Sequence, residues 1–334
     1  MKSITKSQLS NEQIAALVNK HFNEATLNKA VELEGGMFNS AYLLQCSGEN
    51  SPNQMVLKVG PSPGTPTLTY ETEIMNTEVE VYSLLPRENI PAPMVLASDF
   101  SRDTIPSDCF FMQYIEGTPW KDISKKIPKE NRSALMYELG RCNAAVHSIK
   151  GEHFGYPKAD KHFRHDTWGE AFLTMVEDIL KDGEKRSCRL PYESVRECLV
   201  KHRDLLNEIT TPVLVDFDMW AGNVFLKQGE KKGYEISGIV DFERAFYGDA
   251  YADFTSAVML FDDVNAEPEF CAGYSDVSGK TLAITTNDKI RMDMYRLYMA
   301  LIMHVETYRY NTVYAVGIKK YTNSQIKTLL KKLN

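Results

Sequence analysis

Residues 215–226 read Val-Asp-Phe-Asp-Met-Trp-Ala-Gly-Asn-Val-Phe-Leu, and residues 236–243 read Ile-Ser-Gly-Ile-Val-Asp-Phe-Glu. Two β-rich runs in this region, 224–227 and 234–240, flank a turn that is rich in Gly and Lys. Alternating apolar runs joined by such a turn are typical of a β-hairpin. The sequence therefore predicts a hairpin whose two ends carry the polar residues of both stretches.

The predicted hairpin places Asp218 and Asn223 near one end and returns Asp241 to their side. Phosphoryl transfer needs a carboxylate that orients the attacking hydroxyl, and an amide oxygen plus a second carboxylate that hold Mg²⁺ against the nucleotide phosphates. The alternative is an ordinary hairpin bordered by solvated acids. A lone Asp and Asn would favour that alternative, but the following Ile-Val-Asp-Phe-Glu argues against it.

These stretches resemble the aminoglycoside phosphotransferase and choline kinase-like superfamily, distant relatives of protein kinases. The family pattern is a hydrophobic pair, His-x-Asp, a gap with Gly before Asn, and then Asp-Phe/Trp-Glu. Residues 214–223 and 241–243 match it except at Asp216, where the family usually has His. Residues 248–253, Gly-Asp-Ala-Tyr-Ala-Asp, resemble the family's Gly-Asp-Pro-x-x-Asp, with Ala250 replacing Pro.

The resemblance implies an α+β, two-lobed protein-kinase-like fold. Its small β-rich nucleotide-binding lobe would span residues 1–115, and its larger, mainly helical catalytic and acceptor-binding lobe would span residues 116–334. It also implies a small-molecule O-kinase that uses ATP, with GTP as an alternative, and Mg²⁺. In this reading Asp218 is the catalytic residue, and Asn223 and Asp241 bind the metal.

The nucleotide loop is expected between two strand-like runs that meet at Gly35-Gly36. Glycine lets the backbone approach a ligand closely, and turn N–H groups can hold phosphate oxygens. Gly-Gly before Asn-Ser is also an ordinary hairpin turn. The family's nucleotide loop has the form Gly-x-x-Asn-x, so the resemblance assigns Gly36, Asn39 and Ser40 to nucleotide binding.

Lys58 lies within the apolar run Met-Val-Leu-Lys-Val, where an unpartnered ammonium would be costly to bury. Alone, it could be an edge-strand lysine that reaches water. The resemblance makes it the lysine that grips phosphates, paired with Glu78 from a helix predicted at residues 69–85. Glu80 is the competing partner, and the two lie about 200° apart on a helix, so both cannot face Lys58.

A strand at Cys109-Phe-Phe-Met-Gln-Tyr-Ile ends in Glu-Gly-Thr-Pro at residues 116–119, a predicted hinge. The family's adenine contacts come from the backbone at this place. The resemblance assigns them to Gln113 and Ile115.

The rest of the chain is predicted to be mainly helical, after a short capped helix that follows Ser10. The predicted helices are 131–148, 167–181, 192–208, 249–260 and 289–309. In the last of these, Met294, Tyr298, Leu301 and Val305 recur at helical spacing, which predicts a core-facing stripe. His147 is interpreted as a packed residue.

Composition indicates a large globular enzyme, with 43% hydrophobic and 25% charged residues in 334. A formal net charge of −7 argues against a nucleic-acid partner. The chain shows no apolar signal core and no long apolar run, so a cytoplasmic protein without membrane contact is expected, monomeric or weakly dimeric. The scattered cysteines and the single His-x-x-His, at 162 and 165, predict neither disulfides nor zinc.

The acceptor is expected to be a small molecule with a hydroxyl group. Four acidic residues after the catalytic block favour a cationic, aminoglycoside-like acceptor, although a solvated acidic loop is the simpler reading: Asp262, Asp263, Glu267 and Glu269. A pseudokinase or nucleotide-binding protein is the alternative, motivated by Asp216. A protein acceptor is disfavoured because no Ala-Pro-Glu follows Asp241, and a serine hydrolase or a Rossmann dehydrogenase because their glycine motifs are missing.

Asp216 is expected to brace the catalytic loop by accepting backbone N–H bonds, which would keep it charged and lower its pKa. Its charge, two residues from Asp218, would raise the pKa of one of the two carboxyls.

Overall fold

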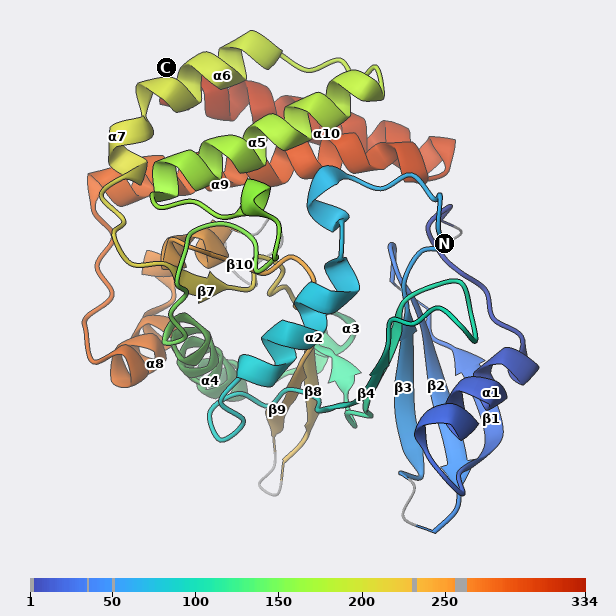
Figure 1. The fold of residues 1–334 in the computed structure, drawn as a ribbon. Coiled ribbons are helices and arrows are strands. Elements are labelled where there is room, and N and C mark those ends of the chain that lie inside the picture. The colour runs from blue at the N-terminus through green and yellow to red at the C-terminus, as the bar shows by residue number, and fades with distance from the viewer. Residues whose placement is uncertain (1–2, 35, 50–51, 230–232, 256–262) are drawn as a thin grey trace. The chain divides into compact units, whose positions relative to one another are not determined.

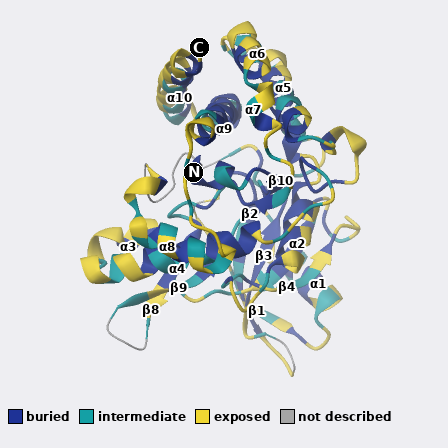
Figure 2. Ribbon diagram, turned by 90° about the vertical axis from the view of Figure 1, so that its left-hand side faces the viewer, coloured by how far each residue is buried: buried dark blue, intermediate teal, exposed yellow. Residues whose placement is uncertain are grey.

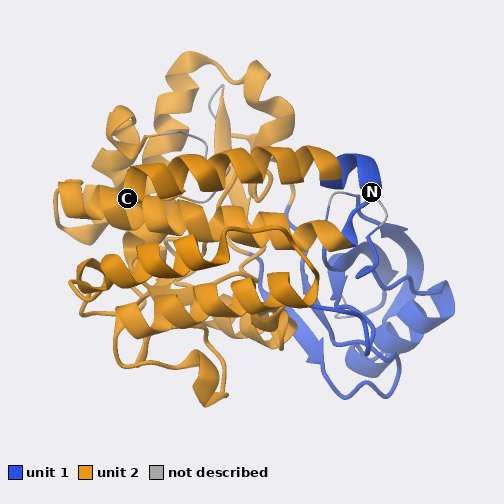
Figure 3. Cartoon of the chain, turned by 90° about the horizontal axis from the view of Figure 1, so that it is seen from above, with its two compact units in different colours: residues 1–67, 93–115, 309–315 blue, residues 68–92, 116–308, 316–334 orange. Residues whose placement is uncertain are grey.

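The computed structural model describes residues 3–34, 36–49, 52–229, 233–255 and 263–334 (Figure 1). By its internal contacts the chain divides into two compact units (Figure 3). Unit 1 comprises residues 1–67, 93–115 and 309–315, and unit 2 comprises residues 68–92, 116–308 and 316–334. The chain passes into unit 2 after Ile115, although 68–92 and 309–315 depart from a division into two continuous segments. As functional lobes, the ranges 1–115 and 116–334 stay a prediction.

Unit 1 is built on an antiparallel sheet of five strands in the order β1-β2-β3-β5-β4. The strands are β1 (Thr26–Glu32), β2 (Ser40–Ser47), β3 (Gln54–Val59), β4 (Val95–Asp99) and β5 (Cys109–Gln113). Buried and more exposed positions alternate along β2, the pattern of a strand with one face on a core. That core includes Leu44, Leu57 and Phe111 and is completed by helix α1.

Helix α1 (Asn11–His21) begins where the sequence predicts a cap. The Ser10 hydroxyl accepts from the Gln13 N–H, and the Gln13 side chain accepts from the Ser10 N–H. Such reciprocal capping satisfies two amide donors that the first helical turn leaves unpaired. The apolar side chains Ile14, Leu17 and Val18 then turn toward the sheet core.

Unit 2 is mainly helical. Its helices are α2 (Ile74–Leu84), α3 (Trp120–Ile123), α4 (Lys129–His147), α5 (Trp168–Lys185), α6 (Tyr192–Lys201), α7 (Arg203–Leu206), α8 (Pro268–Ser278) and α9 (Thr286–Val305), with most of α10 (Thr312–Leu333). Helix α9 is mostly buried after its exposed first turn, and much of its ribbon is dark in Figure 2. The predicted stripe of Met294, Tyr298, Leu301 and Val305 lies in the core, each side chain fully buried.

Two helix predictions need correction. The predicted helix 69–85 is interrupted, because Thr69–Glu71 forms a 3-10 turn and Glu73 adopts a left-handed φ of 56° before α2 begins. The predicted helix 192–208 is broken at His202 into α6 and α7. In the predicted helix 249–260, residues 250–255 form a 3-10 helix, Asp249 precedes it without helical structure, and residues 256–260 lie outside the described residues.

Two small sheets position the polar residues of the opening motif. Strands β8 (Val224–Gln228) and β9 (Tyr234–Ile239) form the predicted antiparallel hairpin, with β6 (Thr118–Pro119) on the outer side of β8. Strands β7 (Val213–Val215) and β10 (Phe246–Gly248) pair with each other on either side of the motif. Among the described residues, no helix combines the length and the apolar character that a membrane crossing requires.

Candidate active site

The catalytic block, residues 214–253, is closed on itself by local pairing. Phe246 in β10 lies opposite Val215 in β7, so the strands before and after the loop and hairpin lie side by side. Within it, the Val240 N–H donates to the Asn223 carbonyl at 3.0 Å. This bond brings the end of the hairpin, and with it Asp241, beside the loop that carries Asp218 and Asn223.

The loop backbone is braced by Asp253. Its carboxylate accepts from the N–H groups of Asp216 at 3.2 Å and Phe217 at 2.6 Å, and from His147 Nε2 at 2.8 Å. Phe217 has a left-handed φ of 60°, a conformation that costs a non-glycine residue on the order of 1 kcal/mol or more. Asp253 therefore holds a strained turn just before Asp218. His147 is packed, as predicted, and serves this brace.

The predicted lowering of the pKa of Asp216 is wrong. Its side chain is fully buried, and neither carboxyl oxygen makes a hydrogen bond of regular geometry among the described residues, although the Asp218 N–H is a weak backbone donor beside it. Burial, followed by the nearby charge of Asp253, raises the pKa of Asp216 well above its ordinary value. The loop is braced through the backbone N–H of Asp216, and the acceptor is Asp253, so the side chain of Asp216 is not the main brace of the loop.

Asp218 and Asn223 lie together, as predicted. The Asn223 amide nitrogen donates to the Asp218 carbonyl at 3.0 Å and lies 3.4 Å from the Asp218 carboxylate. Burial is the main cause that raises the pKa of Asp218 to about 8; Arg244 opposes the rise, and the charges of Asp241, Glu243 and Glu306 add to it. A carboxyl tuned toward neutral pH suits a general base.

Three carboxylates from two elements form the candidate metal centre. Glu78 of α2, Asp241 and Glu243 each offer an oxygen, and these oxygens lie within 4.8 Å of one another. Asp241 has a left-handed φ of 76°, and its N–H donates to the Tyr82 hydroxyl at 3.0 Å. Oxygen ligands of this kind fit Mg²⁺, as does the amide oxygen of Asn223, whose nitrogen is turned to Asp218.

Sequence reasoning missed Arg244 and Glu306. Arg244 Nη2 donates to Glu306 Oε1 at 2.9 Å, and Arg244 Nε lies 3.8 Å from Asp218 Oδ2. The available signal was the position of Arg244, which directly follows Asp-Phe-Glu and precedes the apolar pair Ala-Phe. Glu306 lies 62 residues further on, and its partner could not be read from the sequence.

In unit 1, the residues assigned to the nucleotide loop lie at the β1–β2 connection. Asn39 and Ser40 are buried, and the Phe38 carbonyl accepts from the Thr5 hydroxyl at 2.9 Å. The Arg309 guanidinium lies 5.0 Å from the centre of the Phe38 ring. A Cβ at Gly36 would meet the Asn39 carbonyl at 3.2 Å, so the turn is close-packed there. Gly35 is outside the described residues.

Lys58 lies in β3, between Ala41 of β2 and Phe110 of β5, and only 8% of it is exposed. In unit 2, Glu78 is buried and Glu80 is exposed, which favours Glu78 as the inward-facing residue of α2. Lys58 and Glu78 belong to different units, and their ion pair stays a prediction.

The adenine contacts assigned to Gln113 and Ile115 also stay a prediction. The Gln113 N–H donates to the Met94 carbonyl at 2.8 Å, so this donor is already engaged within unit 1.

The acidic residues expected at the acceptor site are engaged elsewhere. Glu267 pairs with Arg132 at 3.1 Å, and Asp263 caps the turn at Asn265. Glu269 lies 3.5 Å from the Ser133 hydroxyl, and Asp262 is outside the described residues. These contacts with α4 leave Glu267 and Glu269 turned to a neighbouring helix.

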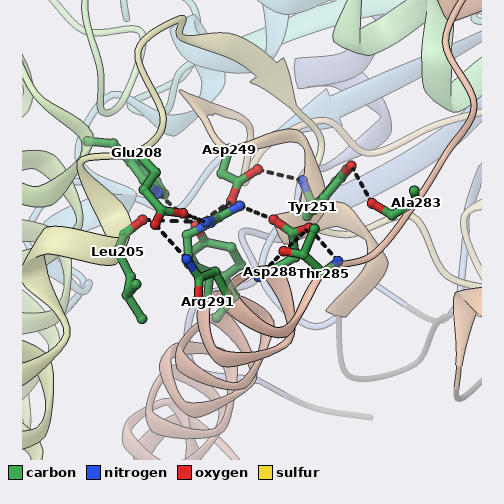
Figure 4. Close-up of polar contacts among 11 residues, drawn as sticks. Leu205, Glu208, Asp249, Tyr251, Ala283, Thr285, Asp288 and Arg291 are labelled. Carbon is green, nitrogen blue, oxygen red and sulfur yellow. Dashed lines mark hydrogen bonds and ion pairs between the residues drawn. The ribbon is translucent and has the colours of Figure 1, made fainter.

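Arg291 of α9 joins a residue of the catalytic block, Asp249, to residues on either side of the block in sequence (Figure 4). Its guanidinium donates to Asp249 at 2.9 Å and to Glu208 at 2.8 Å, and it also pairs with Asp288. The Tyr295 hydroxyl donates to the same Asp249 oxygen at 2.8 Å. Asp249 of the Gly-Asp-Ala-Tyr-Ala-Asp stretch is thus a structural anchor.

Comparison with known proteins identifies the class. The family model described as the phosphotransferase enzyme family matches residues 29–284, and the chain belongs to that family. A search of curated proteins gives no match.

Solved structures share the fold. A GDP complex of aminoglycoside 2'-phosphotransferase-IIIa is 12% identical with a TM-score of 0.62, and 96% of this chain covers 99% of that one. A ternary complex of APH(4)-Ia with AMP-PNP and hygromycin B is 13% identical with a TM-score of 0.61, over 96% and 98% of the two chains. A streptomycin–ATP complex of APH(2″)-IIa is 17% identical with a TM-score of 0.59, over 97% and 99%.

These likenesses confirm the predicted fold class, the α+β protein-kinase-like fold of the aminoglycoside kinases. The family match makes the protein a member of a phosphotransferase enzyme family.

Proposed function

We propose that the protein transfers the γ-phosphoryl group of ATP, with GTP as an alternative donor, to a hydroxyl of a small molecule. The observation that carries this proposal is the placement of Asp218 beside Asn223, with Asp241 in a three-carboxylate cluster. The neighbours described above hold adenine or guanine nucleotides, and two of them hold an aminoglycoside.

Each residue has a distinct task in this proposal. Asp218 accepts or orients the proton of the acceptor hydroxyl. Asn223 and Asp241 hold Mg²⁺, which when bound neutralises charge on the nucleotide phosphates. Lys58, with Glu78 as its partner, positions the phosphates. Rate enhancement comes mainly from positioning and charge stabilisation.

Acid excess supports a cationic acceptor. Asp218 lies in a field in which Asp241, Glu243 and Glu306 are negative and Arg244 is positive. An acceptor with an amino group near the reacting hydroxyl would be attracted to this field, and a neutral one would gain nothing from it. Two of the structural neighbours hold aminoglycosides, which are compounds that carry basic groups as well as hydroxyls: hygromycin B and streptomycin.

An acceptor panel tests the proposal. ADP and GDP release is coupled to candidate aminoglycosides, choline-like amines, homoserine, sugars and macrolides, with Asp218→Asn as the control that must lose turnover. Turnover on an amine supports the full proposal. Turnover on neutral sugars or macrolides alone would exclude the cationic acceptor. Nucleotide binding without turnover on any acceptor would favour the pseudokinase alternative.

A further inference from the structure

Two buried side chains outside the predicted site, Tyr70 and Glu306, form a hydrogen-bonded chain with the partly buried Arg244, which lies next to Asp218; the three residues are here called the Tyr70 relay. The Tyr70 hydroxyl donates to Glu306 Oε1 at 2.8 Å. The same oxygen accepts from Arg244 Nη2 at 2.9 Å. Arg244 Nε then lies 3.8 Å from Asp218 Oδ2, within ion-pair range and beyond hydrogen-bond range.

The far end of the relay is rigid. Tyr70 is 4% exposed, and its backbone carbonyl accepts a hydrogen bond from the buried Lys158 ammonium. Its ring stacks on Tyr156 with the centroids 6.0 Å apart and the planes at 18°. Glu306 is also 4% exposed. The oxygen that holds Arg244 is therefore fixed on two sides.

The relay determines how far Arg244 stands from the catalytic carboxylate. An arginine beside an isolated carboxylate forms two parallel hydrogen bonds and occupies both oxygens. Here Glu306 takes one nitrogen, and Nε has no hydrogen-bond partner among the described residues. Asp218 thus keeps a balancing charge nearby while its Oδ2 is not closed off by a bidentate arginine.

We propose that Tyr70 and Glu306 are positioning residues that act through Arg244 to keep Asp218 open to the acceptor hydroxyl. This inference rests on the proposed function. Tyr70 lies in the 3-10 turn directly before α2, which carries Glu78 of the carboxylate cluster. One segment, residues 69–84, thereby positions both the base and a carboxylate of the candidate metal centre.

Two conservative variants test the relay against a matched control. Tyr70→Phe and Glu306→Gln keep shape but remove the hydroxyl or the charge. Tyr156→Phe is the control, because this buried tyrosine stacks on Tyr70 while its hydroxyl pairs with Tyr298 at 2.7 Å, outside the relay. We expect kcat to fall about fivefold to tenfold in Tyr70→Phe and more in Glu306→Gln, since small misplacements of catalytic groups are costly.

The expected signature is confined to kcat. The KM for the nucleotide stays within about twofold of wild type, and Tyr156→Phe keeps wild-type kcat while both tyrosine variants melt at similar temperatures. In an Arg244→Lys background, Tyr70→Phe should lower kcat by much less than it does alone, because the two residues act through one path. Equal kcat losses in both tyrosine variants, or full additivity with Arg244→Lys, would overturn the relay.

Loss of the proposed function is separable from loss of the relay. If the wild-type protein transfers no phosphoryl group to any acceptor, the proposed function fails. The relay is then judged by crystal structures of wild type and Tyr70→Phe. Movement of the Arg244 guanidinium toward Asp218 in the variant supports the relay, and an unmoved guanidinium contradicts it.

Discussion

Two arginines contact carboxylates of the catalytic block, Arg244 from within the block and Arg291 from α9, and their hydrogen bonding differs. Arg291 bonds through Nε and both terminal nitrogens to Asp249, Glu208 and Asp288. Arg244 spends one nitrogen on Glu306 and directs another to the sulfur of Met299 at 3.6 Å. Its Nε is left 3.8 Å from Asp218.

This difference in hydrogen bonding distinguishes a structural arginine from one beside the candidate catalytic residue. A guanidinium whose nitrogens all bond to carboxylates has no N–H donor left for a ligand, and it fixes the elements that it joins. A guanidinium with a remaining N–H beside a carboxyl of raised pKa can respond when a ligand arrives. We therefore expect changes around Arg291 to act on stability, and changes around Arg244 and Asp241 to act on turnover.

The largest effect is expected from Asp241→Ala. Loss of a metal ligand should lower nucleotide turnover by about 10³-fold or more, because the triphosphate charge stays uncompensated. Since Asp241 lies among other carboxylates, its removal relieves repulsion, and this offsets the strain that Ala meets at a φ of 76°, so the melting temperature should change little. ADP release titrated with Mg²⁺ and a thermal melt check both points. Near wild-type turnover would show that the metal is held elsewhere.

The two arginines themselves give the next test. Arg291→Met should lower the free energy of unfolding by about 3–5 kcal/mol, because it leaves buried carboxylates without their partner. Turnover per folded molecule should change little. Arg244→Met should do the reverse, with a smaller loss of stability and a loss of kcat of about 10²-fold. Denaturant titrations with kinetics on both variants measure the contrast, and equal profiles would remove it.

Lys158 adds a buried amine to the comparison: its Nζ donates to the Tyr70 carbonyl and lies over the rings of Tyr156 and Phe163. Burial lowers its pKa from 10.5 to about 7, against the opposing charges of Glu73, Glu71 and Asp178. Between these two values the unfolded chain binds a proton that the folded chain does not, so stability rises with pH by up to about 1.4 kcal/mol per unit. Below pH 7 this contribution is at its minimum.

Lys158→Met should therefore gain stability relative to wild type most at pH 6–7, and the gain should shrink toward pH 10. Urea unfolding of both proteins at several pH values measures it. Lys185→Met is the control, because that side chain is 68% exposed. A difference between wild type and Lys158→Met that does not change with pH would mean that Lys158 stays charged in the folded protein.

The smallest effect is expected from Asp216→Asn. Because burial raises the pKa of Asp216 and thereby favours its uncharged form, an amide of the same shape should replace it with only a modest loss of kcat, about tenfold at most. The backbone bond to Asp253 is kept. Steady-state kinetics against wild type measure the change, and a complete loss of turnover would give Asp216 the catalytic role assigned to Asp218.

The residues predictable from the sequence are those whose contacts are local. Asp218, Asn223 and Asp241 are brought together by one hairpin and one backbone bond, and the hairpin has a clear strand and turn pattern. The helix at Ser10 and the stripe along α9 follow from capping and periodicity in the same way.

The rest depends on long-range contacts or on burial. Glu306 meets Arg244 only because α9 folds back on the catalytic block. The break before α2 depends on the left-handed conformation of Glu73, and the sequence has no glycine at this position that would predict it. The raised pKa of Asp216 follows from its burial beside Asp253, a property of the folded environment that its residue type does not reveal.

Phosphorus NMR of the reaction tests the central claim most directly. Wild type, Asp218→Asn and Asp216→Asn are incubated with Mg²⁺, ATP and the acceptor found in the panel. We predict that the γ-phosphate signal of ATP is replaced by that of a phosphate monoester with wild type and Asp216→Asn, and that Asp218→Asn binds ATP but forms no ester. Ester formation by Asp218→Asn at the wild-type rate, or release of inorganic phosphate alone by wild type, would contradict the account.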